Sequence, residues 1–229
     1  MLSFPSHAHC QSLTTLVRGR IARLAARGRS RAVAGGELVY RMGDPTDHLY
    51  VVLDGRVRTS IVSPAGRELV LGVHGPGEVF GELCFCAIRR RQEQAVAVVD
   101  SRVVRLRVDD LLSLVAGDQA EALALLDVFC QRMADLQDRL AQLAFANVRT
   151  RLGLLLLRLV DGQPAGPDGG AVCPERLTHE ELAARVATTR EQVTAILTQF
   201  REQGLVDYRR GGPIVVFPDR LGRHLETAS

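Results

Sequence analysis

Residues 177–200 read LTHEELAARVATTREQVTAILTQF, and this stretch predicts two short helices separated by a turn. Thr178 precedes Glu181 by three residues, which is the spacing of a capping box at the start of a helix. Small and hydroxyl residues then interrupt the apolar pattern, and Thr188 or Thr189 is placed to cap a second helix.

The second predicted helix has one apolar and one polar face. Its apolar side chains recur at helical spacing at Val193, Ile196, Leu197 and Phe200. Its polar side chains gather in the first turns, where a recognition helix contacts base edges. They are Thr189, Arg190, Glu191 and Thr194. An ordinary helical hairpin shows the same pattern, so this stretch alone leaves both interpretations open.

The segment that follows favours the first interpretation. Residues 205–217 read LVDYRRGGPIVVF, which predicts a β-hairpin with a glycine turn. Arg209 and Arg210 lie at its tip, where they suit phosphate oxygens. A helix, a turn, a helix and such a hairpin make a winged helix. Residues 175–210 contain six arginines and six acidic residues, so DNA binding is inferred from the positions of the charges.

Length and composition are typical of a globular protein. The chain has 229 residues, enough for two modest domains, with 46% hydrophobic and 24% charged residues. No apolar run approaches the ~20 residues that cross a bilayer, and the N-terminus has no pattern of a secretion signal. Five cysteines without disulfide-like spacing fit a reducing compartment. We therefore expect a soluble cytoplasmic protein.

Residues 1–108 are predicted to form one domain, with a helix near residues 13–24 and then short strands. Antiparallel strands at this spacing predict a β-barrel or jelly roll. The expected strands are 37–40, 48–53, 56–62, 67–73, 94–99 and 102–108.

Residues 109–147 are predicted to form one long helix with a heptad seam. The seam residues alternate spacings of three and four: Leu126, Phe129, Met133, Leu136, Leu140, Leu143 and Asn147. Such a stripe predicts a two-helix coiled coil between subunits. Packing of this helix on its own barrel is the alternative, and we favour the dimer because the stripe is narrow.

Residues 148–229 are predicted to form the second domain. An Arg- and Leu-rich helix at 148–160 precedes a surface loop at 161–170, the winged helix and a short tail. The predicted fold class is α+β, with an N-terminal β-barrel, a long dimerisation helix and a C-terminal winged helix-turn-helix.

The order of these parts resembles the cyclic AMP receptor protein / fumarate–nitrate regulator (CRP/FNR) family. The similarity covers nearly the whole chain, and its specific points are residues 54–57 (DGRV), 77–83 (GEVFGEL), 143–145 (LAF), 177–178 and 190–191. The resemblance implies a cytoplasmic, homodimeric bacterial transcription factor that binds palindromic double-stranded DNA and RNA polymerase. It also implies that an effector in the barrel-like domain reorients the two winged helices.

The resemblance implies DNA contacts for individual residues. Arg190 and Glu191 match the family's base-reading arginine and glutamate, and Thr194 stands where some relatives have serine. Ala195 replaces a second arginine that reads guanine, which removes roughly 1–3 kcal/mol of discrimination at that base. The predicted DNA-binding set comprises Thr188, Thr189, Arg190, Glu191, Thr194, Arg209 and Arg210.

The effector site matches the family less well. The segment Gly81, Glu82 and Leu83 matches the one whose glutamate binds a ribose hydroxyl, and Arg91 is placed to pair with a cyclic phosphate. The cyclic AMP binders have Ser or Thr where Gln92 stands, and Glu93 adds a like charge beside the phosphate. Two further expected effector residues, Leu136 and Gln137, replace a hydroxyl pair that contacts adenine. Cyclic AMP therefore stays one candidate, and an internal Glu82–Arg91 ion pair is the alternative.

The sequence does not identify a cofactor, and it predicts no metal site. Cys10 alone does not make an N-terminal iron–sulfur site, and His7, His9 and Cys10 lack nearby partner ligands. Cys84 and Cys86 would face the same side of a strand, as a thiol redox switch or soft-metal site would require. Buried inert cysteines are the simpler interpretation of this pair.

Two alternatives to a DNA-binding regulator are an enzyme and a module that binds other proteins. A cupin-like metalloenzyme would need closely spaced histidines, but the predicted barrel offers only His48 and His74, far apart in sequence. A nucleotide-sensing module that acts through protein partners would lack specific binding to duplex DNA.

Overall fold

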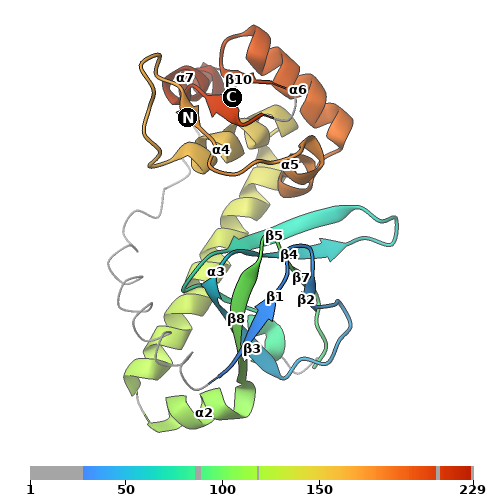
Figure 1. Ribbon diagram of the computed structural model, residues 1–229, viewed down its shortest axis with the longest axis vertical. Helices are drawn as coiled ribbons and strands as arrows, with labels where there is room; N and C mark the ends of the chain where they lie inside the picture. The colour runs from blue at the N-terminus through green and yellow to red at the C-terminus, as the bar shows by residue number, and fades with distance from the viewer. Residues whose placement is uncertain (1–27, 86–88, 118, 210–211, 228–229) are drawn as a thin grey trace. The chain divides into compact units, whose positions relative to one another are not determined.

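The computed structural model describes residues 28–85, 89–117, 119–209 and 212–227 (Figure 1). The helix expected near residues 13–24, His7, His9, Cys10, Cys86 and Arg210 lie outside these ranges. The chain divides into two compact units, of which one ends at Leu136 and the other begins at Gln137. Within the described residues, no helix combines the length and the apolar character needed to cross a membrane.

The N-terminal unit contains two four-stranded antiparallel sheets with the strand orders β1-β8-β3-β6 and β2-β7-β4-β5. The jelly-roll-like fold is confirmed, although the strands form two open sheets and not a closed barrel. The strands are β1 (Arg29–Val33), β2 (Leu38–Tyr40), β3 (His48–Asp54), β4 (Val57–Val62), β5 (Glu68–His74), β6 (Val79–Phe80), β7 (Gln94–Ala97) and β8 (Ser101–Arg107).

Apolar side chains from both sheets form one core. Val52, Val57 and Phe80 are fully buried in it, together with Ala97 and Val103. Strand β3 is buried from His48 to Val52, because its other face packs against a second cluster that includes Cys84 and Leu111. Gly55 forms the tight turn after β3 with φ +81°, and a Cβ there would lie 2.3 Å from Ser101 Oγ.

Two local predictions in this unit are wrong. Glu82–Phe85 forms a short 3-10 helix, η2, and not a strand, so the rule of alternating faces does not apply to Cys84. The helix expected over 109–147 is two helices, α2 (Val108–Gly117) and α3 (Gln119–Phe145). Leu111 of α2 is buried beside Leu106 of β8, and Gly117 supplies a common stop signal at the end of α2.

The C-terminal unit packs helices and a three-stranded sheet around one core. Its elements are α4 (Val148–Val160), β9 (Ala171–Val172), α5 (His179–Val186), α6 (Arg190–Glu202), β10 (Val206–Tyr208), β11 (Ile214–Val216) and α7 (Pro218–Thr227). The sheet order β10-β11-β9 confirms the predicted hairpin and adds β9, which the sequence did not predict.

The predicted short tail is wrong, because residues 218–227 form the packed helix α7. Its Leu221 and Leu225 are buried in the core of this unit. Gly153 of α4 allows a close approach, since a Cβ there would lie 2.8 Å from the methyl groups of Leu225. The C-terminal segment therefore contributes to the stability of the winged-helix core.

Candidate DNA-binding and effector sites

Helix α5 and helix α6 have the caps that the sequence predicts. The Thr178 side chain accepts a hydrogen bond from Glu181 N, and the Glu181 carboxylate accepts from Thr178 N in return. Thr189, not Thr188, caps α6 by accepting from Gln192 N. Ala187 ends α5 in the left-handed conformation with φ 54°, which makes the sharp turn between the helices.

The faces of α6 follow the prediction. Val193, Leu197 and Phe200 are fully buried. Arg190 and Glu191 are exposed in the first turn, where protein helices most often contact base edges. Because three buried side chains fix the rotation of the helix, this polar face is held outward.

The Thr194 hydroxyl is already engaged. It donates to Arg190 O at 2.9 Å, so it accepts from His179 Nδ1 at 2.8 Å. His179 also packs edge-on against Tyr208 of β10 at 5.9 Å between ring centroids. Burial, followed by the nearby charge of Arg190, lowers the pKa of His179. This neutral link joins α5 to α6 and restricts Thr194 as a reader of bases.

The remaining predicted DNA residues lie near the same face. Thr188 is half-buried and donates to the side chain of Gln192 in α6. Thr189 is exposed, and Arg209 is exposed directly after β10 in the hairpin. Arg210, the other predicted residue of the hairpin tip, falls in a gap of the described chain. The roles of Thr189, Arg209 and Arg210 as phosphate contacts, and of Thr188 in DNA binding, stay predictions.

Two arginines of α4 hold the helix-turn-helix together, and no sequence motif predicted them. Arg149 donates to Gln199 at 2.6 Å and to Gln203 at 2.7 Å, at the far end of α6. Its guanidinium also lies over the ring of Phe200, 4.7 Å from the centroid. Arg151 donates to Val186 O at 3.0 Å, at the end of α5, and desolvation lowers its pKa. These contacts orient α5 and α6 within their own unit.

Helix α3 exposes most of the predicted seam. The exposed apolar side chains are Leu126 (58%), Met133 (60%), Leu136 (47%), Leu140 (67%) and Leu143 (43%). Phe129 differs, because it is half-buried and meets Phe85 of η2 edge-on at 5.7 Å. One face of α3 therefore packs on its own domain, and another face is exposed in the single chain. The coiled coil between subunits stays a prediction.

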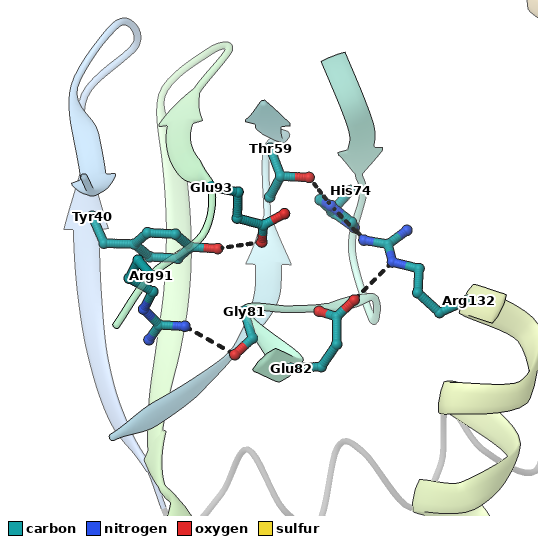
Figure 2. A network of polar contacts seen from close by, with 8 residues as sticks. All are labelled: Tyr40, Thr59, His74, Gly81, Glu82, Arg91, Glu93 and Arg132. Atoms are coloured by element: carbon teal, nitrogen blue, oxygen red, sulfur yellow. Dashed lines mark hydrogen bonds and ion pairs between the residues drawn. The ribbon is translucent and has the colours of Figure 1, made fainter. Parts of the chain in front are cut away.

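A cluster of mostly buried polar residues, which we call the sandwich cluster, lies inside the N-terminal unit (Figure 2). It consists of Tyr40, Thr59, His74, Gly81, Glu82, Arg91, Glu93 and Arg132. Arg91 is 3% exposed and donates to Gly81 O at 2.9 Å and to His48 O at 2.6 Å. Its guanidinium lies over the ring of Tyr40, 4.1 Å from the centroid. Within the described chain, its Nε has no hydrogen-bond acceptor.

Glu82 forms an ion pair, but not with Arg91 as the alternative interpretation expected. Its partner is Arg132 of α3, whose Nε lies 2.9 Å from Glu82 Oε1. Arg132 also donates to His74 Nε2 at 2.9 Å, and Thr59 Oγ1 lies 3.1 Å from the same nitrogen. The second carboxylate oxygen of Glu82 is buried without a partner among the described residues. The sequence could not show that α3 would supply this arginine.

Glu93 completes the cluster. It is 8% exposed and accepts a hydrogen bond from the Tyr40 hydroxyl at 2.8 Å. Desolvation raises the pKa of Glu93, and it also raises the pKa of the Tyr40 phenol. The carboxyl group therefore holds a proton more readily than an exposed glutamate does.

Other predicted effector residues lie at the surface. Leu83 is 38% exposed and Gln92 is exposed, with its side-chain amide donating to Arg90 O. Leu136 and Gln137 are exposed on α3. Only Gly81, Glu82 and Arg91 of the predicted set belong to the sandwich cluster.

The thiols offer no exposed pair in the described part of the chain. Cys84 is buried at 5% exposure in the apolar cluster beside β3, which suits an inert packing residue. Burial raises the pKa of the Cys173 thiol to about 11, which disfavours its reactive thiolate. Across the described residues, no three His, Cys, Asp or Glu side chains gather as metal ligands would. A pairing of Cys84 with Cys86 stays a prediction.

Comparison with known proteins assigns a family to both units. Residues 30–118 match the cyclic nucleotide-binding domain, and residues 150–223 match the Crp-like helix-turn-helix domain. The CRP-like cAMP-activated global transcriptional regulator of Mycobacterium tuberculosis is 30% identical over 188 residues, which cover 82% of this chain and 84% of that protein. The cyclic AMP receptor protein of Thermus thermophilus is 33% identical, over 75% of this chain and 76% of the relative.

A solved structure agrees with this assignment. The c-di-GMP responsive global regulator CLP of Xanthomonas campestris superposes with a TM-score of 0.77 at 27% identity, covering 87% of this chain and 98% of that one. The chain belongs to the CRP/FNR family of transcription regulators. Membership of a family of transcription regulators supports the regulator and speaks against the cupin-like metalloenzyme.

Proposed function

We propose that the protein acts as a homodimeric, sequence-specific transcription regulator whose N-terminal domain senses a small molecule. The single observation that carries the proposal is the capped helix α6, which presents Arg190 and Glu191 outward from three buried side chains. Arginine and glutamate have the donor and acceptor geometry to read guanine and cytosine edges in the major groove. Family membership supports duplex DNA as the partner.

Dimerisation is proposed through the exposed stripe of α3. Five apolar side chains between Leu126 and Leu143 are each at least 43% exposed in the single chain. Their spacing suits knobs-into-holes packing against a second copy of the helix. The two copies would then place two recognition helices on a palindromic site, with RNA polymerase as the further partner that the family suggests.

The proposed effector site is the sandwich cluster, which connects the β-strands to α3 through Glu82 and Arg132. A ligand that competes for either group would change how α3 is held by its own domain. Cyclic AMP is the candidate that the matched domain and two named relatives suggest. The burial of Cys84 gives a thiol effector less support.

Fluorescence anisotropy with a selected duplex tests the reading of DNA by α6. The double variant Arg190→Ala and Glu191→Ala should lose roughly 1–3 kcal/mol of discrimination at each base pair that it no longer reads, while salt-dependent non-specific binding remains. A matched control is Arg201→Ala with Glu202→Ala, the same residue types at the exposed end of α6. Discrimination equal to that of the unchanged protein would refute the assignment.

A further inference from the structure

The charges of the sandwich cluster already balance before any ligand binds. Arg91 and Arg132 supply two positive charges, and Glu82 and Glu93 supply two negative charges when both carboxyl groups are ionised. Arg132 is committed to Glu82 and His74. A ligand phosphate would therefore add one uncompensated negative charge to a buried site, where like charges interact strongly.

Arg91 is the cation at which an anionic ligand group would bind. Its Nε is buried and without an acceptor in the described chain, and its other two nitrogens reach only backbone carbonyl groups. Arg91 packs directly against Gly81, where a Cβ would lie only 2.7 Å from Arg91 Nη1. No carboxylate neutralises this guanidinium by a described direct hydrogen bond.

Glu93 is held close to that position through Tyr40. The Tyr40 ring lies against the Arg91 guanidinium, while its hydroxyl donates to the Glu93 carboxylate at 2.8 Å. Figure 2 shows the Glu93 carboxyl group between Tyr40 and the His74–Arg132 pair. The charged and titratable groups around it are Tyr40 from β2, Glu82 from η2, Arg132 from α3, Arg91, and His74 from β5, which bonds to Arg132.

We propose that Glu93 determines the ligand specificity of the sandwich cluster by disfavouring a phosphate group at Arg91. The inference rests on the proposed role of this domain as the effector domain. An ionised Glu93 repels the phosphate and holds Tyr40 in place against Arg91. The amide oxygen in Glu93→Gln can accept the same Tyr40 hydrogen bond without the repulsion. Cyclic AMP therefore binds the unchanged domain less tightly than it binds Glu93→Gln, unless its binding brings a proton to Glu93.

Calorimetric titration of the full chain with two matched ligands tests the proposal. Cyclic AMP carries the phosphate charge, and adenosine presents the same base with an uncharged ribose. Near neutral pH, Glu93→Gln should bind cyclic AMP roughly tenfold more tightly than the unchanged protein does. A tenfold change corresponds to a repulsion between Glu93 and the phosphate that would shift a pKa by about one unit. Adenosine affinity should change less than about threefold, because the ligand has no charge for Glu93 to repel. Glu37→Gln, at an exposed carboxylate, should leave both affinities unchanged.

The unchanged protein provides a second test that needs no variant. Its cyclic AMP affinity should rise as the pH is lowered from about 8, because the raised pKa of Glu93 lets the carboxyl group take up a proton with the ligand. The Glu93→Gln protein should lose this dependence.

Three results would each overturn the proposal. They are no gain in cyclic AMP affinity in Glu93→Gln, an equal gain for adenosine, or no measurable binding of either ligand by any of the proteins. If Glu93→Gln fails to fold, a pH-independent affinity of the unchanged protein overturns it. If the unchanged protein binds no specific duplex DNA, the proposed function is contradicted, but the calorimetric result still stands.

Discussion

At Glu93, burial and hydrogen bonding act on the same carboxyl group in opposite directions. Desolvation is the larger effect and raises its pKa, whereas the hydrogen bond from Tyr40 lowers it. A raised pKa means that the folded state binds the proton more tightly than the unfolded state does. The free energy of unfolding therefore falls as the pH rises from about 4.5, the ordinary value, through the raised folded value.

The substitution Glu93→Gln should remove this loss of stability at high pH. The hydrogen bond from Tyr40 is retained because the amide oxygen can accept it. The melting temperature of Glu93→Gln minus that of the unchanged protein should be larger at pH 8 than at pH 5. Each 1 kcal/mol gained in the free energy of unfolding raises the melting temperature by roughly 2–4 °C. Differential scanning calorimetry at the two pH values measures this, and a difference that does not vary with pH would show that Glu93 is not the titrating group.

The sequence predicted single residues where a local pattern fixed them. The capping box of Thr178 and Glu181 and the buried face of α6 are confirmed, because caps and helical spacing depend on residues a few positions apart. It did not predict that Arg132 would pair with Glu82, a contact across fifty positions. Which of several arginines reaches a buried carboxylate depends on packing between distant elements.

At the scale of elements, helix α3 has one face that packs on the N-terminal domain and another that is exposed. Arg132 and Phe129 contact the N-terminal domain, at Glu82 and at Phe85. The apolar stripe on another face stays exposed in the single chain. The heptad pattern predicted the stripe, but not the break between α2 and α3. The pattern of residues 126–143 says nothing of residues 108–117, which form α2 with Leu111 buried against the N-terminal domain.

The double substitution Leu136→Asp and Leu140→Asp should yield monomers. Both side chains are exposed in the single chain, at 47% and 67%, so the fold should survive, whereas a coiled coil would bury two unpaired charges at a cost of several kcal/mol. Sedimentation equilibrium measures the mass of the assembly. Leu112→Asp on α2, at a leucine that is 51% exposed, is the matched control and should remain dimeric. A double variant that sediments as a dimer would refute the proposed seam.

At the scale of the whole molecule, a strand-rich N-terminal domain and a C-terminal winged-helix domain were predictable from the order of patterns along the chain. A strand-rich region, a heptad helix and a winged helix occur in that order, and both family models match the corresponding residues. The division at Leu136–Gln137 was not predictable, because helix periodicity continues across it. The domain boundaries at 108 and 147 therefore remain predictions.

Selection of binding sites from random duplex DNA by the full chain tests the central claim most directly. Two α6 helices presented by one dimer should enrich a two-fold symmetric sequence, with half-sites about 10 base pairs apart from centre to centre. The Arg190→Ala and Glu191→Ala variant should enrich no such sequence under the same conditions. A single asymmetric half-site, or the same palindrome selected by the variant, would contradict the account.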